Sequence, residues 1–155
     1  MPKFCVATDS GCDLPMYFCK EKNIYPLQMP YYIGDEEYID TMNHVDFKHF
    51  YDIIRNGAIP RTSQVNVYEF IEFWESLLHF NLPIVHICLG SGISGTYSNG
   101  LQAVELMKEK YPNQEIYLVD STLASVGYGM LAIKAAEMRD EEKTAQECVE
   151  WLEKH

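Results

Sequence analysis

The sequence predicts a three-layer α/β/α domain with a mostly parallel sheet, on the basis of two observations. Apolar segments of strand length alternate with segments whose apolar residues recur at helical spacing, which is the pattern of successive βαβ units. The chain also has 155 residues, of which 47% are hydrophobic, so it is long enough and apolar enough to bury one core of this kind. We therefore expect a single domain over residues 1–155.

The N-terminal part of the chain predicts a buried strand followed by a helix. Residues 3–7 form a short apolar run, and the polar triplet Thr8-Asp9-Ser10 follows where that strand is expected to end. Asp13 has a side chain typical of an N-cap, and Leu14-Pro15 suits a first helical turn. We expect this helix to extend to about Glu21.

An edge strand and a hairpin are expected next. Residues 24–33 are aromatic and aliphatic, but Pro26 and Pro30 interrupt them, and prolines within strands occur mainly at sheet edges. The Gly-Asp-Glu sequence at residues 34–36 supplies a turn, and residues 37–41 can return as the second arm of a hairpin.

Two amphipathic helices are predicted in the middle of the chain. From Asp46 the apolar residues recur at helical spacing, and Gly57 suits the position just after the last helical residue. A polar connector at residues 60–64 follows, and Asn66 with Glu69 forms the sequence pattern of a capping box. In the first helix the residues at this spacing are Phe47, Phe50, Tyr51 and Ile54, and the second helix is expected to bury Val67, Phe70, Ile71, Trp74, Leu77 and Leu78.

The most strand-like segment of the chain covers residues 83–89. A glycine- and serine-rich turn at residues 90–96 follows it and leads into a helix, which the sequence Tyr111-Pro112-Asn113 ends. The remaining elements expected are a strand at residues 115–119 and two helices at residues 128–138 and 144–153.

The charge and the cysteine content of the chain disfavour several classes of function. The 23 acidic and 12 basic residues give a net charge of −11, which disfavours nucleic acid and anionic membranes as partners. No apolar run approaches the roughly 18 residues of a membrane span, and no cluster of His, Cys and Asp has metal-ligand spacing. The five cysteines form no Cys-x-x-Cys pair, so we expect buried, reduced thiols in a cytoplasmic protein.

Polar triplets are expected at the ends of three strands of the predicted sheet. They are Thr8-Asp9-Ser10, Gly90-Ser91-Gly92 and Asp120-Ser121-Thr122. In open parallel sheets, ligands bind outside the carboxyl ends of the strands. The turn at residues 90–96 also presents backbone N–H groups at the start of a helix, where an anion can bind. The sequence therefore predicts an anion-binding site at this edge.

The pattern of the turn alone leaves two interpretations open. Gly90, Gly92 and Gly95 match G-x-G-x-x-G between a strand and a helix, and Asp120 could contact a ribose, which would make the protein a dinucleotide-dependent enzyme. In the plainer interpretation, a serine of the turn only caps the following helix. A P-loop is disfavoured because its lysine is absent, and a serine-hydrolase elbow because no serine of the turn has glycine at both −2 and +2. The histidines are expected to be structural or solvated.

Several short motifs occur along nearly the whole chain in an order that is specific when they are taken together. The motifs are Thr8-Asp9-Ser10 with Asp13-Leu14-Pro15, Thr62-Ser63-Gln64, Ser91-Gly92-Ile93-Ser94-Gly95-Thr96-Tyr97, Asp120-Ser121 and Gly127-x-Gly129. With Thr-Ser-Gln and Ser-Gly-x-Ser-Gly-Thr-Tyr both present, the chain resembles the DegV family of bacterial fatty-acid-binding proteins. Val65 departs from the family, which usually has proline after Thr-Ser-Gln.

This resemblance implies a Rossmann-like N-terminal DegV domain that binds a long-chain fatty acid such as palmitate. It implies a carrier without a cofactor, not an enzyme, and a fatty-acid kinase as the expected partner, because some family members present the carboxyl group to such a kinase. The carboxylate would be held by the hydroxyls of Thr62 and Ser94, with Ser63, Gly95 and Thr96 supporting the head-group loop. The family's second, C-terminal domain covers the acyl chain, and we expect it to be absent from this chain.

Overall fold

A four-stranded parallel sheet lies at the centre of the computed structural model, which describes residues 1–155. Its strands, in the order β2-β1-β6-β7, are β1 (Cys5–Asp9), β2 (Ile24–Leu27), β6 (Ile84–Cys88) and β7 (Ile116–Asp120). Every neighbouring pair in this sheet is parallel. The expected α/β fold with a mostly parallel sheet is therefore confirmed.

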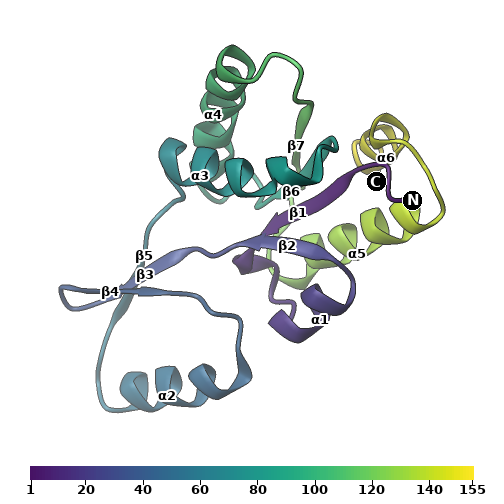
Figure 1. The fold of residues 1–155 in the computed structure, drawn as a ribbon. Helices are drawn as coiled ribbons and strands as arrows, with labels where there is room; N and C mark the ends of the chain where they lie inside the picture. Colours follow the sequence, from purple (N-terminus) through teal and green to yellow (C-terminus); the bar gives the residue numbers. More distant parts are fainter.

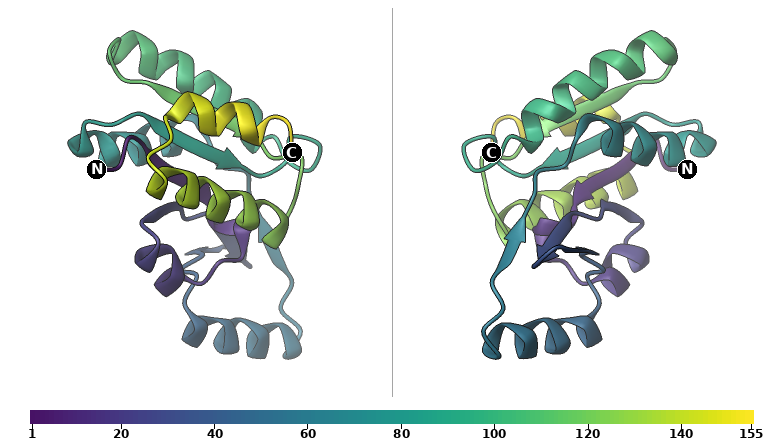
Figure 2. Two further views of the ribbon diagram at one scale, coloured as in Figure 1. Left: turned by 90° about the vertical axis from the view of Figure 1, so that its right-hand side faces the viewer. Right: turned by 90° about the vertical axis from the view of Figure 1, so that its left-hand side faces the viewer.

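Helices cover both faces of this sheet (Figures 1 and 2). Side chains alternate along the strands, so Val85 and Ile87 pack toward α5, whereas Ile84 and Cys88 pack toward α3. Each face of the sheet thus has its own apolar cluster. The helices are α1 (Met16–Glu21), α5 (Val126–Asp140) and α6 (Ala145–Leu152) on one face, and α3 (Val67–Leu77) and α4 (Thr96–Lys110) on the other.

A smaller antiparallel sheet is formed by three further strands. Because β2 and β3 belong to different sheets, the expectation of one edge strand over residues 24–33 is wrong. Between them, the backbone N–H of Met29 donates to the Ser10 hydroxyl at 2.9 Å. The expected hairpin is confirmed as the β3–β4 pair, and β5 lies within the expected polar connector. In the order β4-β3-β5, these strands are β3 (Pro30–Ile33), β4 (Glu36–Ile39) and β5 (Pro60–Thr62).

The helix α2 (His44–Arg55) forms as expected, but its apolar face is not part of the core. None of its residues is buried, and Phe47 and Tyr51 are 40% and 54% exposed. Phe50 contacts the ring of Tyr31 edge-on, with 5.3 Å between ring centroids. Figure 1 shows α2 set apart from the parallel sheet. The helical spacing predicted from the sequence is therefore present, but periodicity shows only which side of a helix is apolar and not what covers it.

The two N-caps expected from the sequence have different outcomes. The capping box is confirmed, because the side chain of Asn66 accepts the N–H of Glu69 at 3.0 Å and Glu69 accepts the N–H of Asn66 at 2.7 Å. Asp13 does not cap α1, whose N-cap is Pro15. Instead Asp13 has a φ of 56° and ends the 3₁₀ helix η1 (Ser10–Cys12). Aspartate tolerates this left-handed conformation better than most residues, so it ends one turn instead of starting the next.

Candidate functional site

The triplet Thr8-Asp9-Ser10 is buried, and its side chains are used within the fold. The Thr8 hydroxyl donates to the carbonyl oxygen of Ile87 at 3.0 Å, and the Ser10 hydroxyl accepts from Met29, as described above. These bonds join the end of β1 to the end of β6 and to the segment after β2. The triplet therefore braces the sheet edge, and it presents no exposed group to a ligand.

Asp9 forms the end of a buried chain of hydrogen bonds. The indole Nε1 of Trp74 donates to Nδ1 of His86 at 3.0 Å, and Nε2 of His86 lies 2.7 Å from Oδ1 of Asp9. An indole N–H can only donate, so Nδ1 accepts and the imidazole proton lies on Nε2. Both ring nitrogens of His86 are thus occupied, which gives this histidine a structural role.

The carboxylate of Asp120 fixes the two loops on either side of it. Its Oδ1 accepts the backbone N–H of Ser91 and that of Thr122, each at 3.0 Å. Burial works to raise the pKa of Asp120, but these hydrogen bonds outweigh it and hold the pKa below its ordinary value. Asp120 therefore orders the turn after β6, and its Oδ1 is already occupied.

The turn after β6 leaves several backbone donors free. Gly90 allows the close approach of the loop after β7, because a Cβ there would lie 2.8 Å from the backbone carbon of Thr122. Beyond it, five N–H groups find no acceptor within the chain, and they lie at the start of α4, where the helix dipole favours an anion. They belong to Gly92, Ser94, Gly95, Tyr97 and Ser98.

Ser94 lies at the point where this turn meets the helix. Its Oγ accepts the backbone N–H of Thr96 at 3.1 Å and lies 2.9 Å from Oγ1 of Thr96. Ser94 is partly exposed, whereas Thr96 is fully buried. Ser94 thus satisfies one free donor of α4, as the plainer interpretation expects, and it still presents its hydroxyl at the surface.

The connector after β5 packs directly on this turn. The backbone N–H of Val65 donates to Oγ1 of Thr96 at 3.2 Å, and Nδ2 of Asn99 donates to the carbonyl oxygen of Val65 at 2.8 Å. The side chain of Gln64 lies over Gly95, so closely that a Cβ at Gly95 would overlap its oxygen. Val65, Gln64 and Asn99 were not among the residues expected to bind or support the carboxylate. Gln64 belongs to the Thr-Ser-Gln motif, which was the available signal, whereas the residue types of Val65 and Asn99 are ordinary for a loop and a helix.

Thr62 and Ser63 lie next to this contact without taking part in it. Thr62 ends β5 opposite Tyr31 and is exposed, and Ser63 is half-buried. No hydrogen bond joins either side chain to Ser94 or to the rest of the chain. The structure thus joins Ser94, Gly95 and Thr96 to the connector through Gln64 and Val65, and it leaves the Thr62 hydroxyl unpaired.

The geometry of the turn does not suit a dinucleotide. Asp120, the expected ribose ligand, accepts two backbone N–H groups through one oxygen. In the dinucleotide motif the third glycine allows close packing of helix on strand, whereas Gly95 packs against the side chain of Gln64 in the connector. The resemblance to G-x-G-x-x-G therefore does not extend to the surroundings of the turn.

Cysteines and metal-ligating residues form no reactive centre. All five cysteines are buried and unpaired. Burial raises the pKa of Cys5 to about 11 and that of Cys148 to about 12, so these thiols are protonated at neutral pH. No group of three or more His, Cys, Asp or Glu residues is placed to hold a metal ion.

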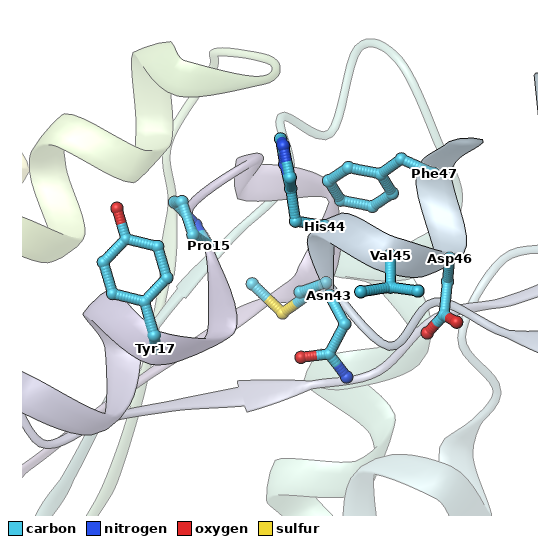
Figure 3. Close-up of a pocket in the computed structure, with 8 residues that line it drawn as sticks. Pro15, Tyr17, Asn43, His44, Val45, Asp46 and Phe47 are labelled. Atoms are coloured by element: carbon cyan, nitrogen blue, oxygen red, sulfur yellow. The ribbon is translucent and has the colours of Figure 1, made fainter.

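A hollow of about 760 Å³ lies away from the turn, between the start of α1 and the start of α2. In Figure 3 the rings of His44 and Phe47 lie side by side on α2, and Tyr17 on α1 lies across the opening. None of the expected site residues lines it. No sequence pattern indicates this hollow, because it depends on how far α2 stands from the rest of the fold.

The fold and the turn together define an α/β domain with a turn of free backbone N–H groups at the carboxyl edge of its sheet. The family model described as "uncharacterised protein, DegV family" matches residues 3–155. A DegV domain-containing protein of Clostridium perfringens is 37% identical over 156 residues, which cover all of this chain and 54% of that protein. This chain therefore belongs to the DegV family.

Two solved structures from Thermotoga maritima share this fold, each with a TM-score of 0.86 and 25% sequence identity. One is described as a DegV lipid-binding protein, and the match covers 98% of this chain and 53% of that one. The other is described as a hypothetical protein that reveals a fatty-acid-binding function, and the match covers 99% and 55%. The chain thus spans about half the length of the relatives that it matches. None of its helices combines the length and the hydrophobicity of a membrane span.

Proposed function

We propose that this chain binds a long-chain fatty acid such as palmitate, with the carboxylate at the turn between β6 and α4. The observation that carries the proposal is the series of hydroxyl contacts that begins at Val65. Because the N–H of Val65 donates to Oγ1 of Thr96, the Thr96 hydroxyl can donate in turn to Oγ of Ser94. The hydroxyl proton of Ser94 is then free to bond an acceptor outside the chain.

The free N–H groups around Ser94 support a carboxylate as that acceptor. Those of Gly92, Gly95 and Tyr97 lie in the same turn or in the first turn of α4. Each hydrogen bond to a charged group contributes about 1.5–3 kcal/mol. Local donors of this kind suit a protein of net charge −11, whose overall field repels anions.

Thr62 is the second hydroxyl that we propose for the carboxylate. It is exposed at the end of β5 and makes no hydrogen bond within the chain, and the nearby Val65 is fixed on the turn. In this proposal Ser63, Gly95 and Thr96 support the loop that holds the head group. Thr96 does so through its contacts with Val65 and Ser94.

The acyl chain would supply most of the affinity, and the head group would set the orientation. Burying each methylene contributes about 0.8 kcal/mol, so a long tail outweighs the hydrogen bonds of one carboxylate. The related Thermotoga maritima protein with a fatty-acid-binding function supports this class of ligand. A ligand with a short or polar tail would lose this contribution.

We also propose that the protein is a carrier and that it presents the acid to a separate fatty-acid kinase. His86 has no free nitrogen for proton transfer, and none of the five cysteines is exposed. Because Ser94 is partly exposed, a carboxyl group bound to it would lie near the surface. Buried, reduced thiols fit a cytoplasmic location.

The test is a comparison of palmitate with methyl palmitate, which has the same tail and no carboxylate. Ser94→Ala should weaken palmitate binding about ten- to a hundredfold and leave methyl palmitate binding unchanged, because only the former loses a charged hydrogen bond. Ser76→Ala is the matched control, since Ser76 is an exposed serine on α3 whose hydroxyl donates to Phe73. A purified protein that contains no palmitate and takes up none when palmitate is added would contradict the proposal. Binding of NAD that Asp120→Asn abolishes would contradict it as well.

A further inference from the structure

Three buried side chains from three elements form a polar chain inside the apolar layer under α3. Trp74 lies on α3, His86 on β6 and Asp9 at the end of β1, and each is fully buried. The rings of Phe70 and Phe73 pack against His86, with centroids 5.4 and 5.7 Å from its own. Polar groups in such surroundings destabilise the fold unless every donor and acceptor is satisfied. In the series Trp74–His86–Asp9, both ring nitrogens of His86 and both oxygens of Asp9 have partners.

The direction of each hydrogen bond follows from the indole. Trp74 donates to Nδ1, so neutral His86 carries its proton on Nε2 and donates it to Oδ1 of Asp9. Oδ2 of Asp9 accepts the backbone N–H of Leu89 at 2.7 Å. Asp9 therefore accepts through both oxygens, from the imidazole of His86 and from a backbone N–H.

Leu89 connects this chain to the candidate site. It is the last residue before Gly90, and the turn with its free N–H groups begins there. The N–H of Gly90 is itself held by the carbonyl oxygen of Leu123 at 2.9 Å. The backbone at the entry to the turn is thus held from two sides, by Asp9 through Leu89 and by the loop after β7 through Gly90.

We propose that Asp9 is a positioning residue for the fatty-acid carboxylate: held by His86 and Trp74, it fixes Leu89 and thereby places the donors of the turn after β6. Asp9 does not touch the ligand. This role rests on the proposed function. In this proposal His86 connects α3 to the turn, because it bonds Trp74 on α3 and Asp9, which holds Leu89.

Two substitutions at His86 separate positioning from packing. In His86→Gln, the amide oxygen can accept from Trp74 and the amide nitrogen can donate to Asp9, so the polar chain is kept. In His86→Phe, a ring of similar shape fills the aromatic surroundings, but Trp74 and Asp9 each lose a partner. His79→Gln and His79→Phe are the matched controls, because His79 is exposed on the 3₁₀ helix η2 (Leu78–Phe80).

The readouts are palmitate affinity and hydrogen exchange at the Leu89 amide. His86→Phe should weaken palmitate binding about tenfold and speed Leu89 exchange at least tenfold, whereas His86→Gln should stay within about threefold of the unchanged protein in both. If His86→Phe binds palmitate at least as tightly as His86→Gln and its Leu89 amide exchanges no faster, packing suffices and the proposal is overturned. Unchanged affinity with faster Leu89 exchange overturns it too, because the turn would then not depend on Leu89.

A third variant keeps the proposal testable if His86→Phe fails to fold. Trp74→Phe removes the indole N–H together with part of the ring volume, and Trp151→Phe on α6 is the control for the loss of ring volume. In the unchanged protein, the ¹⁵N signals of His86 should show the Nε2–H tautomer, and Trp74→Phe should change them and speed Leu89 exchange. An Nδ1–H tautomer in the unchanged protein would overturn the proposal. These NMR signals need no ligand, so they distinguish a failure here from a failure of palmitate to bind.

Discussion

The backbone N–H of Val65 donates to the hydroxyl oxygen of Thr96 over 3.2 Å, although the two residues lie 31 positions apart in the sequence. Asn99 makes a second contact, because its Nδ2 donates to the carbonyl oxygen of Val65 at 2.8 Å. The connector after β5 and the start of α4 therefore behave as one unit. A substitution on either side of this contact should therefore shift the other side, and with it the hydroxyls proposed to bind the carboxylate.

Thr96→Val tests this unit directly. The substitution keeps the shape of the side chain but removes the oxygen that accepts from Val65 and contacts Ser94. A buried N–H without a partner costs about 1–3 kcal/mol, so urea denaturation should show a loss of that size in the free energy of unfolding. Palmitate affinity should fall as well. Thr96→Ser should restore both, and a Val variant as stable as the unchanged protein would show that the contact contributes nothing.

Two glycines of the turn should respond differently to alanine. At Gly90 a Cβ would lie 2.8 Å from the backbone carbon of Thr122, whereas at Gly92 nothing lies within 4 Å. Neither glycine has a positive φ, so only the available space differs. Gly90→Ala should cost about 1–3 kcal/mol of unfolding free energy, and Gly92→Ala less than about 0.5 kcal/mol. Thermal unfolding measures both, and equal effects would contradict the close approach of the loop after β7.

The contribution of Asp120 should depend on pH. Its pKa is lowered in the folded protein, because its hydrogen bonds with Ser91 and Thr122 outweigh the effect of burial. A lowered pKa stabilises the fold above the unfolded value, which is about 3.9 for aspartate, and this stabilisation disappears as the pH falls through the folded value. Asp120→Asn should therefore be less stable than the unchanged protein at pH 7, and the difference should narrow below about pH 4. If the difference in unfolding free energy stays constant from pH 7 to pH 3, the ionised carboxylate of Asp120 does not stabilise the fold.

The sequence predicted the strands β1, β6 and β7 of the parallel sheet well because each of them is short, apolar and followed by polar residues. In the helix α3, the expected core residues Phe70, Trp74 and Leu77 are buried, and the capping box that begins the helix is present. These features are local: the spacing of apolar side chains and one capping pattern decide them. Asp13 shows the limit of local patterns, since an N-cap and the end of a 3₁₀ turn favour the same side chain.

The candidate site was predictable only in part. The turn and its serines stand out in the sequence, but Thr8-Asp9-Ser10 looked equally available and is instead buried and fully bonded. The sequence also gives no reason to place Val65 against Thr96, because that contact depends on how the small antiparallel sheet returns the chain to α4. Long-range contacts of this kind are decided by packing and not by residue type.

The difference between α2 and α3 leads to a final prediction about two phenylalanines. Both helices show an apolar stripe in the sequence, but Phe70 on α3 is fully buried, whereas Phe50 on α2 is only half-buried against Tyr31. Phe70→Ala should therefore cost about 3–5 kcal/mol of unfolding free energy, and Phe50→Ala about 1 kcal/mol. Urea denaturation of the two variants under identical conditions measures both values. A loss at Phe50 as large as that at Phe70 would mean that α2 packs into the core, so the ratio of the two losses reports how far the apolar face of α2 is covered.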